Sequence, residues 1–110
     1  MHSYFKNLYL EIGNDMDLLI ELAKDFKTIY FDSIENLKNA VLEHDYYTMD
    51  RTAHKLKGAS LNFNMPIFSE ATEKIEFIGK DKLKDNTAEF ILVIEKEFRK
   101  FEIECDNLSK

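Results

Sequence analysis

Glycine and proline are scarce in this chain, whose 110 residues include three glycines and one proline. Because these residues make most tight turns, so few of them leave little capacity for the many turns of a sheet-rich fold. Apolar residues instead recur at intervals of three and four, the spacing that places side chains on one face of an α-helix. The sequence therefore predicts an all-α fold made of a few long helices.

The apolar patterns delimit a short leading helix and four longer ones, over about residues 3–12, 14–43, 45–64, 66–79 and 85–105. Asn14 or Asp15 can cap the second helix, and Pro66 suits the first turn of the fourth. Gly13 and Gly79 each follow an amphipathic segment, where a left-handed glycine closes a helix. Four amphipathic helices with short connections predict an antiparallel four-helix bundle, with the leading helix packed across one end.

The spacing also predicts the core. The residues expected to face inward are Leu19, Leu22, Phe26, Ile29, Ser33, Leu37 and Ala40 or Val41 in the second helix; Tyr46, Met49, Ala53, Leu56, Ser60 and Phe63 in the third; Phe68, Ala71, Ile75 and Ile78 in the fourth; and Thr87, Ile91, Ile94, Phe98, Phe101 and Cys105 in the last. We expect residues 1–110 to form a single domain, with a leading helix over 1–13, a bundle over 14–105 and a tail over 106–110.

Charge and hydropathy narrow the classes of partner. The formal net charge is −6, and the phosphate backbone of nucleic acids repels an acidic surface. The longest apolar run, over residues 90–94, is far shorter than the roughly 20 residues that span a bilayer, and no basic segment leads into a signal-like apolar core. Cys105 is the single cysteine and cannot form an internal disulfide, which agrees with a reducing compartment. We therefore expect a cytoplasmic protein that binds neither nucleic acid nor membrane.

Gly58 is the residue that the helical pattern does not explain. It lies within the third expected helix and off its apolar stripe, where a glycine costs roughly 1 kcal/mol relative to alanine. Helical steps of about 100° place Gly58 about 40° around from His54 and one turn further on, with Lys57 and Leu61 on the same exposed face. The missing side chain would open space beside a solvent-facing imidazole.

The third expected helix contains the motif His-x-Leu-Lys-Gly-x-Ser over residues 54–60. This motif resembles the signature of histidine-containing phosphotransfer (Hpt) domains, the carriers of multistep two-component phosphorelays. The similarity extends over most of the chain. The spacing of Phe26, residues 37–40 and Asp45 before the histidine is similar to that of the family, as is the pair at 75–76 after it.

The resemblance implies a role for each residue of the motif. His54 would be the phosphorylated residue, Lys57 the cation beside the phosphoryl group, and Gly58 the clearance for an incoming receiver domain. Glu76 falls where the family commonly has an acidic or amide side chain that orients the histidine from the next helix. The family often has a glycine ten residues after the histidine, where this chain has Asn64. Because asparagine tolerates left-handed geometry, we expect the helix ending to be retained.

Imidazole chemistry agrees with this interpretation. With a reference pKa of about 6.5, imidazole presents an unprotonated ring nitrogen as a nucleophile near neutral pH. If Glu76 accepts a hydrogen bond from Nδ1–H of His54, Nε2 is the nitrogen left to attack. The chain has no Walker motif, glycine-rich nucleotide loop or evident metal-binding carboxylate cluster, so we do not expect it to use ATP unaided. The resemblance implies that it has no cofactor of its own and that a receiver domain supplies the aspartate and the Mg²⁺.

Three further residues are candidates for the surface that meets a partner. Tyr47, Asp50 and Leu61 could flank the histidine as a receiver docking face, or could be ordinary boundary residues. The expected partners of a monomeric carrier are response-regulator receiver domains, with a hybrid sensor histidine kinase as a further candidate. His2 and His44 are not spaced to pair with another histidine or cysteine on a helix, so no metal site is predicted. The sequence leaves open whether the chain is free-standing or belongs to a larger kinase.

Two other classes of function stay open. A non-phosphorylated helical adaptor, or a pseudo-Hpt interaction module, would have the same bundle but no reason to keep His54, Lys57 and Gly58 together. A helical enzyme or metal carrier would need acids and histidines that face the bundle interior, whereas the predicted inward stripes are apolar. The preferred interpretation is a histidine phosphocarrier that is not an enzyme by itself.

Overall fold

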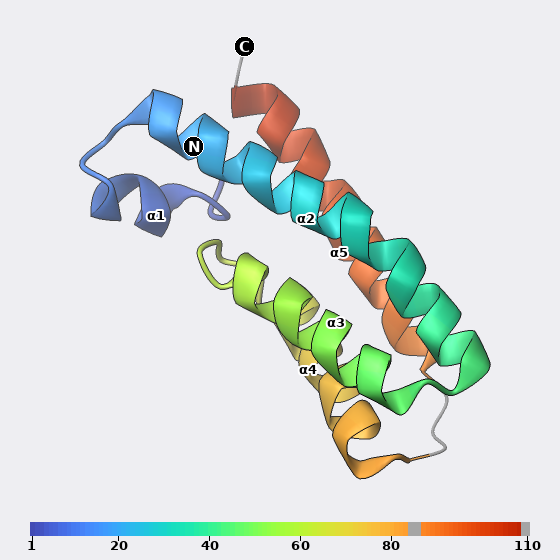
Figure 1. Ribbon diagram of the computed structural model, residues 1–110. Helices are drawn as coiled ribbons and strands as arrows, with labels where there is room; N and C mark the ends of the chain where they lie inside the picture. The colour runs from blue at the N-terminus through green and yellow to red at the C-terminus, as the bar shows by residue number, and fades with distance from the viewer. Residues whose placement is uncertain (84–86, 109–110) are drawn as a thin grey trace.

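The computed structural model describes residues 1–83 and 87–108. These residues form five α-helices and no strand: α1 (Lys6–Glu11), α2 (Met16–Glu43), α3 (Tyr46–Ser60), α4 (Pro66–Asp81) and α5 (Ala88–Leu108). Figure 1 shows α2 and α5 side by side as the long pair, α3 and α4 as a shorter pair, and α1 at one end. The predicted antiparallel four-helix bundle with an additional N-terminal helix is confirmed.

A short polar turn joins α1 to α2. Gly13, with φ of +74°, and Asn14, with φ of 60°, adopt the left-handed conformation after α1. Asp15 then caps α2, because its carboxylate accepts a hydrogen bond from the backbone N–H of Leu18 at 3.0 Å. Of the two capping candidates, Asp15 is therefore the cap and Asn14 belongs to the turn.

The third helix ends earlier than its sequence predicts. α3 ends at Ser60 instead of near Asn64, and Asn64 is absent from the described non-glycine residues with positive φ. The backbone N–H of Asn64 donates instead to the carbonyl oxygen of Tyr4 at 3.1 Å. The expectation of a left-handed Asn64 is wrong because this residue ties the α3–α4 loop to the segment before α1.

The outer ends of the chain also differ from the prediction. α1 covers only Lys6–Glu11 of the expected 3–12. α5 continues to Leu108, beyond the expected end at Cys105, because no glycine or proline follows to stop it. Its expected start at Asp85 lies outside the described residues. None of the helices described is long and apolar enough to cross a membrane.

Gly79 does not close α4, contrary to the prediction. The helix continues to Asp81, and Lys82 adopts the left-handed conformation at its end, with φ of 52°. Gly79 is buried inside the helix, where a Cβ would lie 2.7 Å from the backbone nitrogen of Asp50 and 2.8 Å from the carbonyl oxygen of Tyr46. The glycine is required for a close approach of two helix backbones and not for a turn.

The core is centred on aromatic rings at the α1 end of the bundle. The ring centroid of Phe101 lies 4.9 Å from that of Phe63, 5.1 Å from that of Phe26 and 5.4 Å from that of Phe5. All the predicted inward residues of the fourth and last helices are buried, and so are those of the third except the half-buried Tyr46. Edge-to-face and tilted ring packing therefore anchors the leading segment to the bundle.

One predicted core position of α2 is wrong. Ile29 is only half-buried, whereas Tyr30 and Ile34 are buried; Leu22 is half-buried but packs against the core. The buried positions step by four, three and four from Leu19 through Ala23, Phe26 and Tyr30, whereas the predicted stripe steps by three, four and three over the same stretch. The two stripes coincide again at Ser33, Leu37 and Ala40, which are buried as predicted.

Candidate functional site

Helix α3 presents His54 to solvent. Asp45 begins the helix, because its carboxylate accepts hydrogen bonds from the backbone N–H and the hydroxyl of Thr48 at 3.2 and 2.7 Å. Ala53 and Leu56 are fully buried against the rest of the bundle. The side chain of His54 points to the other side and is 66% exposed, so another protein can reach its ring.

Glu76 contacts His54 from the neighbouring helix. On α4, Ile75 and Ile78 are buried in the core, and Glu76 is directed toward α3 with only 8% of its side chain exposed. Nδ1 of His54 lies 3.1 Å from Oε1 of Glu76, within hydrogen-bonding distance. Nζ of Lys80, one turn further along α4, lies 3.2 Å from the same oxygen. Two donors therefore converge on one oxygen of a buried carboxylate.

The surroundings of Glu76 determine its charge. Burial is the largest single influence on the pKa of Glu76 and raises it, but the hydrogen bonds from His54 and Lys80 and the charges of His54 and Lys57 together outweigh burial, so the pKa is lowered overall. Glu76 is therefore ionised at neutral pH. Because a carboxylate only accepts hydrogen bonds, Nδ1 of His54 is the donor, and in the neutral ring the lone pair lies on Nε2.

The second oxygen of this carboxylate has a different environment. Oε2 of Glu76 is buried and has no hydrogen-bond partner among residues 1–83 and 87–108. Leaving a buried acceptor unpaired costs about 1–3 kcal/mol. The Glu76 carboxylate is therefore hydrogen-bonded through Oε1 alone among the described residues.

Lys57 follows His54 by one turn and also has a partner on α4. Its Nζ lies 3.9 Å from Oε2 of Glu73, with 29% of the Lys57 side chain and 65% of the Glu73 side chain exposed. Exposed pairs of this kind contribute only about 0–1 kcal/mol. The ammonium group can therefore turn toward an incoming anion at little cost. Lys55, by contrast, lies on a different side of α3 and is exposed.

Gly58 leaves open space next to the histidine. A Cβ at this position would have nothing within 4 Å. Nearby, Tyr47 is 75% exposed and Leu61 is 64% exposed, whereas Asp50 is half-buried. Tyr47 and Asp50 precede His54 by two turns and one turn of α3, and Leu61 directly follows the helix. The structure thus gathers the predicted docking residues along one helix, and their part in docking stays a prediction.

Three residues of this site escaped the sequence analysis: Lys80, Glu73 and Gly79 in its helix-packing role. Lys80 follows Glu76 by four residues, a helical spacing at which opposite charges meet, so this pair could have been found. The contacts of Glu73 with α3 and of Gly79 with α3 join different helices. No spacing within α4 could have indicated them.

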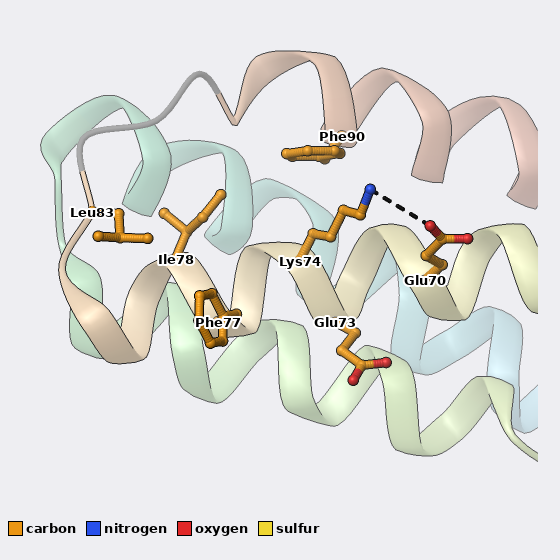
Figure 2. A pocket seen from close by; sticks show the side chains of 7 residues that line it. All are labelled: Glu70, Glu73, Lys74, Phe77, Ile78, Leu83 and Phe90. Atoms are coloured by element: carbon orange, nitrogen blue, oxygen red, sulfur yellow. Dashed lines mark ion pairs between the residues drawn. The ribbon is translucent and has the colours of Figure 1, made fainter.

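A groove of about 420 Å³ lies on another side of α4, between α4 and α5, and is lined by Glu70, Glu73, Lys74, Phe77, Ile78, Leu83 and Phe90. Figure 2 shows Lys74 directed toward Phe90, with Nζ 5.4 Å from the ring centroid, and Glu73 directed to the opposite side of α4. The described residues that line this groove include no histidine, and the groove lies apart from His54.

Other nucleophiles are placed less favourably than His54. Cys105 is buried, and burial raises the pKa of its thiol to about 12, so little thiolate forms at neutral pH. Nδ1 of His2 accepts a hydrogen bond from the backbone N–H of Tyr4 at 3.1 Å. Within the described part of the chain, no group of three or more His, Cys, Asp or Glu side chains could hold a metal ion.

Comparison with known proteins identifies the family. A family model described as the Hpt domain matches residues 21–108, a segment that contains His54, Lys57, Gly58 and Glu76. No match was found among curated proteins or among solved structures. Because the matched segment covers most of the chain, the chain belongs to the Hpt domain family, whose members take part in two-component phosphorelays with receiver domains.

Proposed function

We propose that this chain carries a phosphoryl group on Nε2 of His54 and exchanges it with the aspartate of response-regulator receiver domains. The observation that supports the proposal best is the state of the imidazole: Nδ1 lies 3.1 Å from the buried Glu76 carboxylate while the side chain is 66% exposed. This arrangement orients the ring and leaves Nε2 for a partner. The expected site of the exchange is the cytoplasm, and the receiver of a hybrid sensor kinase is a candidate partner.

The proposed step is a single displacement at phosphorus. The lone pair on Nε2 attacks the phosphorus of the receiver's aspartyl phosphate, the N–P bond forms, and the P–O bond to the aspartate breaks, which returns a free carboxylate. The ring then carries a positive charge because Nδ1 keeps its proton. Glu76 accepts the hydrogen bond from that proton and stabilises the cation. The reverse step regenerates the aspartyl phosphate.

Neighbouring residues have complementary parts in this proposal. Lys57 would leave its weak pair with Glu73 and offset the charge of the phosphoryl oxygens. The open space at Gly58 would let the receiver bring its phosphate in line with Nε2, at the roughly 3–3.5 Å that such a reaction needs. The receiver would supply the Mg²⁺ and most of the catalysis.

The proposal is tested with a panel of purified receiver domains from the same genome. Each receiver is phosphorylated with acetyl phosphate and Mg²⁺, freed from the donor and mixed with this protein or with the His54→Gln variant. We expect at least one receiver to produce acid-labile, alkali-stable phosphate on the parent chain and none on the variant. His54 is exposed and outside the core, so the variant should unfold within about 1 kcal/mol of the parent.

Two results would contradict the proposal. Phosphate retained on His54→Gln would mean that another residue accepts it. Stable binding of a receiver without any transfer would favour the non-phosphorylated adaptor instead.

A further inference from the structure

Gly79 makes the closest approach that a glycine of this chain makes to a neighbouring helix. It is buried within α4, one turn after Glu76. A Cβ at this position would lie 2.7 Å from the nitrogen and 3.1 Å from the Cα of Asp50, and 2.8 Å from the carbonyl oxygen of Tyr46. All three are backbone atoms of α3. They cannot rotate away as a flexible side chain would.

Any side chain at position 79 would therefore push the two helices apart. Cβ atoms in proteins essentially never lie within 3.0 Å of such atoms, and ordinary contacts begin at 3.4 Å. The spacing between α3 and α4 would have to widen here by several tenths of an ångström. Packed backbone does not absorb such a shift without moving its neighbours.

The contact lies directly beside the His54–Glu76 pair. Asp50 precedes His54 by one turn on α3, and Gly79 follows Glu76 by one turn on α4. The hydrogen bond between Nδ1 of His54 and Oε1 of Glu76 is 3.1 Å long, close to the upper end of the range for N–H···O bonds. A separation of several tenths of an ångström would therefore break it or weaken it strongly.

A second contact joins α3 and α4 at a greater distance from the His54–Glu76 pair. The hydroxyl groups of Ser60 on α3 and Ser69 on α4 lie 2.9 Å apart. Ser69 precedes Glu76 by two turns, whereas Gly79 follows it by one. Lys57 and Glu73 also pair across these helices, but that pair is long and solvent-exposed and therefore weak. Of these contacts, the Gly79 contact thus has the greatest control over where the Glu76 carboxylate lies.

We propose that Gly79 is a positioning residue for His54: its missing side chain sets the α3–α4 separation at which Glu76 reaches Nδ1 and fixes the ring with Nε2 unprotonated. The expected effect of Gly79 on phosphoryl transfer rests on the proposed phosphocarrier function. Its structural content, the tautomer of His54, can be measured without any phosphoryl transfer. A failure of one is therefore distinguishable from a failure of the other.

The first test reads the tautomer of His54 directly. Ring nitrogen shifts of ¹⁵N-histidine-labelled protein are recorded at a pH where the ring is neutral, for the parent, Gly79→Ala, Glu76→Gln, Gly58→Ala and Ile78→Val. We expect the Nδ1–H tautomer in the parent, in Gly58→Ala, which meets open space, and in Ile78→Val, which loosens the core side of α4. In Gly79→Ala we expect a mixture with the Nε2–H tautomer, as in Glu76→Gln. An unchanged tautomer in Gly79→Ala would overturn the proposal.

The second test separates positioning from loss of stability. Transfer from a phosphorylated receiver is measured below the melting temperature for Gly79→Ala, Glu76→Gln and the double variant, with Ile78→Val as a destabilised control. We expect Gly79→Ala to slow transfer about as much as Glu76→Gln, each roughly tenfold, with little further loss in the double variant because both act through one hydrogen bond. Multiplied losses, or an equal loss in Ile78→Val, would show that Gly79 only supports the fold.

If Gly79→Ala does not fold alone, the tautomer is read in Gly58→Ala/Gly79→Ala, where the added alanine on α3 raises helix stability. A parent-like Nδ1–H tautomer in that folded double variant would also overturn the proposal.

Discussion

Gly58 and Gly79 lie inside neighbouring helices near the same histidine, yet their surroundings are opposite. Around Gly58 on α3 a Cβ would find nothing within 4 Å, whereas at Gly79 on α4 it would lie 2.7 Å from backbone. At Gly58 the missing side chain leaves open space on the solvent side of α3, whereas at Gly79 it allows the backbones of α3 and α4 to pack closely. Under the proposed function, Gly58 gives a partner access to His54 and Gly79 fixes the geometry of the reacting ring.

The comparison of the two glycines separates one that the packing of the fold explains, Gly79, from one that it does not, Gly58. Helix propensity disfavours both glycines by about 1 kcal/mol relative to alanine. At Gly79 the packing of α3 against α4 outweighs that term. At Gly58 no contact among the described residues offsets that term, and under the proposed function the open space serves the docking of a receiver.

The largest expected effect follows from filling the open space at Gly58, beside His54. Gly58→Leu should lower the rate of transfer from a receiver by about 100-fold, because misplacing reacting groups by about 1 Å has a cost of that order. Helicity should stay at the parent level, since leucine is a good helix former. Stopped-flow or rapid-quench transfer rates and circular dichroism provide the two measurements. Parent-like transfer in Gly58→Leu would show that the space is not used by the receiver.

A smaller effect is expected from adding a side chain at Gly79, where α3 and α4 are in close contact. Gly79→Ala should lower the free energy of unfolding by up to about 2 kcal/mol, because overpacking costs of about 1–3 kcal/mol exceed the gain in helix propensity of about 1 kcal/mol. Urea denaturation measures the change. A Gly79→Ala protein more stable than the parent would mean that α3 and α4 can separate freely.

The local patterns explain why the sequence predicts most of this arrangement but not all of it. The stripes of α4 and α5 and the exposed side of α3 follow from helical periodicity, which depends only on neighbours in sequence. The prediction that Gly79 closes α4 is wrong because a glycine that follows an amphipathic run is typical of a helix end. The close contact between Gly79 and the backbone of Asp50 depends on how α3 and α4 pack, and the sequence of α4 alone does not predict it.

The candidate site shows the same division. His54, Lys57 and Gly58 lie within one helix, so a motif could indicate them together. The pairing of Lys57 with Glu73 joins two helices and could not be inferred from the motif. The contact between Glu76 and His54 also joins two helices, and it was expected only because the chain resembles a family in which that position orients the histidine.

Lys57 and Lys55 allow a comparison of two lysines that lie on different sides of α3. Lys57→Ala should slow transfer about tenfold, since a hydrogen bond to a charged group contributes about 1.5–3 kcal/mol, whereas Lys55→Ala should change the rate less than twofold. Transfer rates under identical receiver concentrations test this. Equal losses in the two variants would mean that general surface charge, and not the position of Lys57, matters.

The smallest expected effect is a gain. Gly58→Ala should raise the free energy of unfolding by up to about 1 kcal/mol, because alanine improves helix propensity and meets no neighbour at this position. Thermal and urea denaturation would both report it. If Gly58→Ala melts at a lower temperature than the parent, Gly58 is required for packing, as Gly79 is.

The most direct test of the account is to locate the phosphoryl group on the protein. After transfer from a phosphorylated receiver to ¹⁵N-histidine-labelled protein, nitrogen–phosphorus couplings identify the residue and the ring nitrogen that carry phosphorus. The account predicts phosphorus on Nε2 of His54, with Nδ1 protonated and hydrogen-bonded to Glu76. Phosphorus on Nδ1 of His54, or on His2 or His44, would contradict it.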